Sequence, residues 1–208
     1  MTPDEFWAVV DAARADSLLD DSALAAHIAA LPPDGVLDIV GESYRDALIA
    51  VLAALTPERI CEYAEAHARA RARLYRWPLW GAGYLIGGGC SDDAFMDFRN
   101  GVLALGREWS ERALAEPDSL AEHPLVAAAG ARGDDAVLFW EDVGYAPALA
   151  FEASTGEGGD AFHRLMDARR PPVREPVGEV GGESWDFDDA DETRERLPRL
   201  SAHFWPED

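Results

Sequence analysis

Helix-start signals are the feature of this sequence that most restricts its fold. Thr2, Pro3 and Glu5 form a capping box with proline in the first turn, and residues 56–58 repeat the order threonine, proline, glutamate. Apolar residues recur after such starts at helical spacing, for example Phe95, Phe98, Val102, Leu105 and Trp109. We find no alternating pattern typical of strands, so the sequence predicts an all-α fold.

The helical signals predict an irregular multi-helix bundle of about six to eight helices. The longest helices are expected over residues 34–55, 57–76 and 134–156. Beyond residue 156 glycine, proline and acidic residues dominate. We therefore expect a helical domain over residues 1–156 and an acidic, largely irregular C-terminal tail over residues 157–208. The end of this tail could dock on the domain through four apolar residues: Leu197, Leu200, Phe204 and Trp205.

The charge of the chain is strongly negative, with 40 acidic residues, 18 basic residues and a formal net charge of −22. All of the basic residues are arginine, so a lysine Schiff base and a lysine-containing phosphate loop are excluded. Because nucleic acid and anionic membranes bind basic surfaces, we expect neither as a partner. A basic protein or peptide partner is compatible with this charge.

The location of the protein is predicted from three features of the sequence. The N-terminal residues MTPDEFW lack the pattern of a signal peptide, and the apolar run at residues 47–55 is too short to span a bilayer. The two cysteines, Cys61 and Cys90, are too few for a disulfide framework. We therefore expect a cytoplasmic protein with reduced thiols.

The segment GGGCSDD, residues 87–93, is the stretch with the most candidate chemistry. As structure, it is a glycine break followed by Ser91 as a helix cap and by two acidic residues in the first turn. The aspartates of this region could also pair with Arg76 or Arg99 and thereby join three helices. We prefer this structural interpretation to a catalytic one.

Two catalytic alternatives remain open for the same segment. Cys90 could act as a nucleophile if His67 or His123 were brought near it as a base. Asp93 and Asp97 lie one helical turn apart and, with Asp92, could bind Mg²⁺ or Ca²⁺. A phosphate cradle at the glycines is disfavoured because the aspartates repel anions. The catalytic candidates are Cys90, Asp92, Asp93 and Asp97, and we predict no cofactor.

Aromatic residues and arginines around this segment are candidates for a binding surface. Trp77, Trp80 and Tyr84 share one face of the helix that starts at Pro78. Such a face is usually buried in a core, but it can also bind a peptide or a cation. The candidate binding residues are Tyr75, Arg76, Trp77, Trp80, Tyr84, Arg99 and Arg107.

A long stretch of the chain resembles a known bacterial family. The string YRWPLWGAGYLIGGGCSDDAFMDFRNGVLALGREWSERALAEPDSLAE is similar to the core motif of domain-of-unknown-function family 4240. The N-terminal Phe6-Trp7 pair also resembles the start of that family. The resemblance covers residues 73–122 in detail and implies no activity.

The function predicted from these features is that of a non-enzymatic module that binds a protein or a peptide. Its binding groove is expected where the aromatic segment at residues 75–86 meets the turn and helix at residues 90–99. One alternative is a metal-dependent or cysteine hydrolase that uses the region from Cys90 to Asp97. Another is an acidic inhibitor or immunity-type protein whose charge imitates nucleic acid.

Overall fold

The computed structural model of the chain describes residues 1–32, 37–169 and 180–206. These residues form twelve α-helices and one 3₁₀ helix, with no strand among them. In chain order the elements are α1 (Pro3–Ala15), α2 (Leu24–Ala30), α3 (Asp38–Ala53), α4 (Pro57–Arg73), α5 (Trp77–Gly87), α6 (Asp92–Ala104), α7 (Arg107–Ala115), η1 (Pro117–Glu122), α8 (Pro124–Arg132), α9 (Glu141–Thr155), α10 (Gly159–Arg169), α11 (Ala190–Arg196) and α12 (Pro198–Phe204). The all-α prediction is confirmed.

The predicted starts of three helices are confirmed by their caps. Thr2 and Glu5 form the capping box of α1, since each side chain bonds the backbone N–H of the other residue. Thr56 and Ser91 cap α4 and α6 by accepting hydrogen bonds from backbone N–H groups one turn later. These bonds satisfy donors that a helix start would otherwise leave unpaired.

The predicted number of six to eight helices is too low. The expected continuous helix after Ser91 is divided into α6 and α7, because Gly106 adopts a positive φ of 93° between them. The helix expected over residues 134–156 begins only at Glu141. The tail expected to be largely irregular contains α10, α11 and α12 in its described part. Local patterns cannot reveal such breaks when apolar spacing continues across them.

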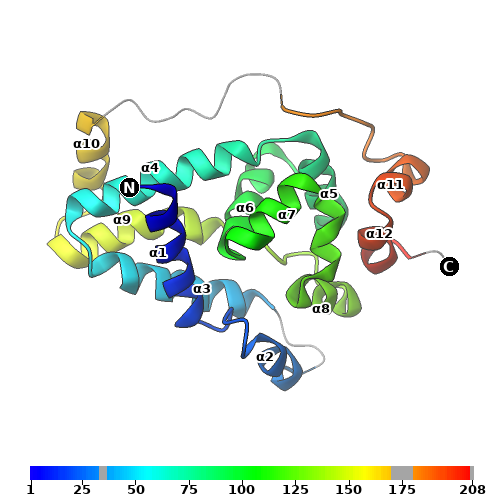
Figure 1. Cartoon of the computed structure of the whole chain (residues 1–208), viewed down its shortest axis with the longest axis horizontal. Helices are drawn as coiled ribbons and strands as arrows, with labels where there is room; N and C mark the ends of the chain where they lie inside the picture. Colours follow the sequence, from blue (N-terminus) through cyan, green and yellow to red (C-terminus); the bar gives the residue numbers. More distant parts are fainter. Residues whose placement is uncertain (33–36, 170–179, 207–208) are drawn as a thin grey trace.

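The helices form two adjoining groups around one apolar core (Figure 1). In the first group α3 and α9 lie side by side, with α1 against α3 and α4 across α9. In the second group α5, α7, α8 and η1 lie close together, and α12 packs against α5, α8 and η1. Leu197 and Leu200, near the chain's end, are buried there. The division into domains at residue 156 stays a prediction.

The connection between α8 and α9 passes through the core that joins the two groups. Leu138 and Trp140 of this connection are buried, and Leu138 has a positive φ of 70°. A Cβ atom at Gly101 of α6 would lie 2.1 Å from the Leu138 carbonyl oxygen, and one at Gly41 of α3 would lie 2.5 Å from the Trp140 indole nitrogen. The two glycines therefore allow the connection to pass directly against both helices. None of the described helices combines the length and the apolarity needed to cross a membrane.

Candidate functional site

Helix α5 has glycines that each lie against an aromatic ring. A Cβ atom at Gly81 would lie 2.3 Å from the Trp185 ring, and one at Gly87 would lie 2.7 Å from the Phe139 ring. Both distances are far below van der Waals contact, so any side chain at these positions would displace a ring. The glycines of this segment thus serve ring packing as well as the turn that follows α5.

The chain's own residues 180–188 cover the outer surface of α5. We define the α5 face as the surface formed by Trp77, Gly81 and Tyr84. The Phe187 ring lies 6.0 Å from the Trp77 ring and 5.3 Å from the Tyr84 ring, measured between centroids. The hydroxyl of Tyr84 donates a hydrogen bond to the Asp188 carboxylate. The predicted aromatic surface is therefore partly occupied by an intramolecular segment.

This segment also pairs with backbone at the start of α5. The N–H of Trp77 donates to the carbonyl of Gly181 over 2.8 Å, and the N–H of Gly181 donates to the carbonyl of Tyr75 over 3.2 Å. Together these bonds make a parallel bridge between Arg76 and Gly181. Arg76 has the extended φ and ψ of −140° and 140° that such a bridge requires.

The other predicted aromatic residues belong to the core behind this face. Trp80 is 9% exposed and stacks on Phe95 with 4.8 Å between ring centroids. The guanidinium of Arg99 lies 4.8 Å from the ring centroids of both Tyr75 and Phe95. Arg99 also donates to the backbone carbonyls of Phe95 and Arg71. This arginine is therefore a packed structural residue rather than an exposed binding group.

The turn after α5 has the backbone expected for a glycine break. Gly88 and Gly89 have positive φ values of 60° and 137°, and Ser91 then caps α6. Burial raises the pKa of the Cys90 thiol to about 12, which disfavours the nucleophilic thiolate. The two histidines offered as its base lie elsewhere, with His67 packed on Phe6 and Tyr63 and His123 packed on Trp109.

The three aspartates of α6 differ in their surroundings. Asp92 and Asp93 are exposed, and Asp92 accepts a hydrogen bond from the Tyr75 hydroxyl over 3.3 Å. Asp97 is half-buried, and one of its carboxylate oxygens has no hydrogen-bond partner among the described residues. Burial, and then the neighbouring charge of Glu141, raise the pKa of Asp97 to about 6. Within the described part of the chain, no group of three or more ligating residues is placed to hold a metal ion.

The arginine network predicted around these aspartates does not form among the described residues. Arg99 contributes the backbone and aromatic contacts given above, whereas Arg107 pairs with Asp4 and Glu111 over 2.9 and 3.0 Å. The guanidinium of Arg76 lies beside Gly181. Ion pairs of the aspartates were expected to join three helices. In the structure, α5 is instead joined to its neighbours by aromatic rings that pack against its glycines.

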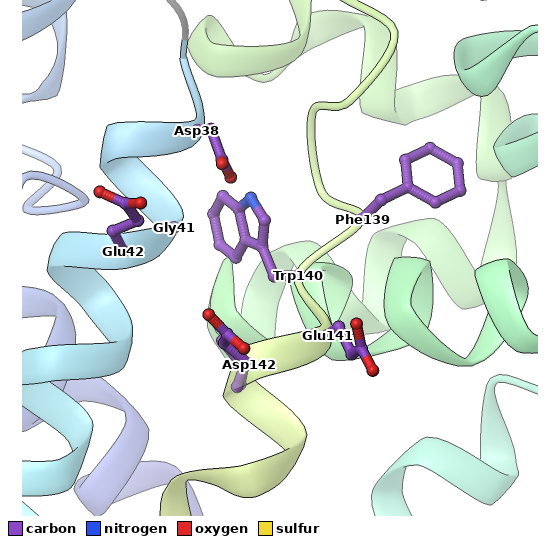
Figure 2. A pocket seen from close by; sticks show the side chains of 8 residues that line it. Asp38, Gly41, Glu42, Phe139, Trp140, Glu141 and Asp142 are labelled. Carbon is purple, nitrogen blue, oxygen red and sulfur yellow. The ribbon is translucent and has the colours of Figure 1, made fainter.

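A small acidic pocket lies where α3 meets the start of α9 (Figure 2). It has a volume of about 170 Å³ and is bordered by four carboxylates. Trp140 lies between α3 and its own connection and is 4% exposed, and its indole N–H has no acceptor in the part of the chain that the structure describes. Asp142 at the rim already pairs with Arg45 over 2.8 Å. The carboxylates are those of Asp38, Glu42, Glu141 and Asp142.

Sequence reasoning did not identify the residues that occupy the α5 face. Trp185 and Phe187 lie in a stretch rich in acid and glycine, which predicted an irregular tail. Their signal was the occurrence of two large aromatic side chains within the acidic string ESWDFDD. Because exposed aromatic residues are unfavourable in water, such a pair indicates a docking segment.

Comparison with known proteins gives a family but no characterised relative. Neither the search of curated proteins nor the search of solved structures gives a match. The model of the family described as "Protein of unknown function (DUF4240)" matches residues 1–153, which include α1 to α8 and most of α9. The segment that covers the α5 face lies outside that match. The chain belongs to the DUF4240 family.

Proposed function

We propose that this protein is a peptide-binding module and that the α5 face is its recognition surface. The observation that supports this proposal is the seating of residues 180–188 on that face. These residues bond the backbone at Tyr75 and Trp77, and they place Trp185 against Gly81. An extended segment held by backbone bonds and by aromatic side chains is a common form of peptide recognition.

The contacts of this segment define the partner that the face would accept. The backbone bonds at Gly181 would fix the direction of an extended peptide. Trp185 and Phe187 would give specificity, because the first fills the space at Gly81 and the second lies between Trp77 and Tyr84. We therefore propose that the partner carries an acidic segment with two aromatic residues at this spacing.

The chain's own segment would compete with such a partner. An intramolecular segment has an effective concentration that can reach the millimolar range, so only a tight or abundant partner displaces it. The partner is thus recognised by residues 1–153, which match the family model and are called the family domain, and residues 180–188 regulate access to it.

The proposal is tested with an opened variant, the full chain carrying Trp185→Ala and Phe187→Ala. A labelled peptide of residues 180–189 should bind this variant at least about tenfold more tightly than it binds the wild type, by fluorescence anisotropy. Helical circular dichroism of both proteins checks that the fold is kept. Failure of the peptide to bind the opened variant would contradict the proposal.

A matched pair of glycine substitutions makes the test specific for the α5 face. Gly81→Ala in the opened variant should abolish peptide binding, because the new Cβ occupies the space of the peptide's tryptophan ring. Gly159→Ala adds the same methyl group at a helical position where the new Cβ would meet no described atom within 4 Å other than its chain neighbours and its own helix backbone, and should leave binding unchanged. Equal losses in the two variants would show that the peptide binds elsewhere.

The other functions predicted from the sequence are supported by fewer observations. A basic partner stays a prediction, and the pocket at Trp140 is where its cationic groups would meet four carboxylates. A hydrolase stays an alternative in which Asp97 is the best candidate acid or base, because its pKa is raised to about 6. Imitation of nucleic acid by the acidic surface is likewise an untested alternative.

A further inference from the structure

A groove between α1 and α4 combines aromatic and cationic residues. It has a volume of about 450 Å³, which is within the range of small-molecule sites. Its apolar lining includes Met1, Phe6, Trp7 and Ala70, and two arginines complete it. We call it the α1–α4 groove. The arginines are Arg69 and Arg73, which lie one turn apart on α4 and are both exposed.

The two arginines of the groove have no partner among the described residues. Neither guanidinium forms a hydrogen bond or an ion pair with any residue in the ranges that the structure describes. Acidic side chains far outnumber arginines in this chain, which has 40 acidic residues, 18 basic residues and a net charge of −22. Two neighbouring arginines without a partner in the described ranges are therefore unexpected on electrostatic grounds.

Four carboxylates of α1 and α4 are already paired with other cations. On α1, Asp4 pairs with Arg107 and Glu5 pairs with Arg59. On α4, Glu62 binds the N-terminal amine over 3.0 Å. Glu65, one turn before Arg69, pairs with Arg169 over 3.1 Å. The groove is thus a locally cationic site with an apolar floor.

We propose that the α1–α4 groove binds a small amphipathic carboxylate. The carboxylate is held by Arg69 and Arg73, since guanidinium groups form charge-assisted hydrogen bonds with that group. The apolar body lies on Trp7 and Phe6. The size of the groove favours a small molecule over a folded partner. This site is separate from the α5 face, so either proposal can fail without the other.

Three probes with chains of similar length and different head groups test the proposal on the full chain. Decanoate should bind at least about tenfold more tightly than 1-decanol and decyltrimethylammonium, as measured by titration calorimetry. The net charge of −22 repels decanoate and attracts the ammonium probe, so a preference for decanoate requires local cations. The indole N–H resonance of Trp7, assigned with Trp7→Phe, should shift when decanoate is added. Equal binding of decanoate and decanol, or no binding of decanoate, would overturn the proposal.

Arginine variants locate the site. The double variant Arg69→Gln and Arg73→Gln should lose the preference for decanoate over decanol, because it removes both charges and keeps a polar side chain at each position. Arg45→Gln is the matched control: this arginine pairs with Asp46 and Asp142, and its loss should leave decanoate binding unchanged. Thermal unfolding of each variant confirms that it is folded. An unchanged preference in the double variant, or an equal loss in Arg45→Gln, would refute the assignment.

The groove could instead be an interface with a second copy of the chain, and this alternative is tested separately. Sedimentation of the wild type and of the double variant shows whether a second copy of the chain uses this surface. A monomer at all concentrations supports the small-molecule site. Self-association that is lost in the double variant would overturn the proposal and assign the groove to an interface.

Discussion

The α5 face and the α1–α4 groove both contain aromatic residues but have opposite surroundings. On the α5 face, Trp77 and Tyr84 are covered by Phe187, and the adjacent backbone is bonded to Gly181. In the groove, Trp7 lies beside two arginines that have no partner among the described residues. The first surface is therefore occupied and the second is open.

This difference shows that a conspicuous motif does not by itself mark an accessible site. The α5 segment is rich in aromatic residues and glycine because it packs against several rings, including Trp185 and Phe139. The groove is formed by two helices whose residues are unremarkable in sequence. On the α5 face, burial of aromatic surface area favours docking of residues 180–188. In the α1–α4 groove, the charges of the two arginines keep the rim polar.

The largest expected effect is on the occupied surface. In the opened variant, loss of Trp185 and Phe187 should lower the free energy of unfolding by about 4 kcal/mol, because two half-buried rings are removed. Urea unfolding measures this change. Tyr145→Ala, at a ring that is 55% exposed, is the control and should cost about 0.5 kcal/mol or less. Equal costs would show that the segment is only loosely held.

An intermediate effect on the free energy of unfolding is expected when the pH is lowered, because of a buried histidine between α1 and α4. His67 is 7% exposed, and burial lowers its pKa to about 3, from an ordinary value of 6.5. Between these two pH values the unfolded chain binds a proton that the folded chain does not, so stability falls as the pH decreases. From pH 7 to pH 5 His67 should contribute a loss of about 2 kcal/mol.

Chemical unfolding at the two pH values tests this prediction in the wild type and in His67→Gln. The variant should lose about 2 kcal/mol less than the wild type over the same change of pH. Two other groups set the background in both proteins. His123 has a pKa lowered to about 3 by burial and acts in the same direction, whereas the raised pKa of Asp97 acts in the opposite direction. An unchanged pH dependence in His67→Gln would show that His67 is not the group that titrates.

The smallest effect is expected in the groove itself. The double variant Arg69→Gln and Arg73→Gln should change the free energy of unfolding by about 0.5 kcal/mol or less, because no ion pair with a described residue is lost. Arg199→Gln should cost more, about 1 kcal/mol, since Arg199 pairs with Asp118 over 2.9 Å and also with Glu116 and Glu122. Thermal and urea unfolding compare the two. A large loss in the groove variant would indicate a structural role for its arginines.

Much of the fold could be predicted because helix starts are local. The capping box at Thr2 and the caps at Thr56 and Ser91 depend on residues within one turn, so the sequence shows them directly. Helix breaks were harder to predict. The positive φ of Gly106 divides α6 from α7, although the apolar spacing continues across it.

The candidate site could be predicted only in part. The aromatic residues of α5 were identified, but their cover by Trp185 and Phe187 joins positions about 100 residues apart, and no local pattern specifies such a contact. Arg76, Arg99 and Arg107 were predicted to line a binding surface. Their contacts within the chain could not be predicted for the same reason. Arg107, for example, pairs with Asp4, which lies 103 residues earlier in the sequence.

The sequence by itself determined that the chain is helical, where most helices begin, and that it belongs among the relatives of one family. Tertiary structure alone decided which aromatic surface is covered, which arginines pair with no described carboxylate, and which histidines and aspartate have shifted pKa values. The physical reason is distance. Caps and helical spacing act within a few residues, whereas burial and charge pairing depend on segments that meet only after the chain has folded.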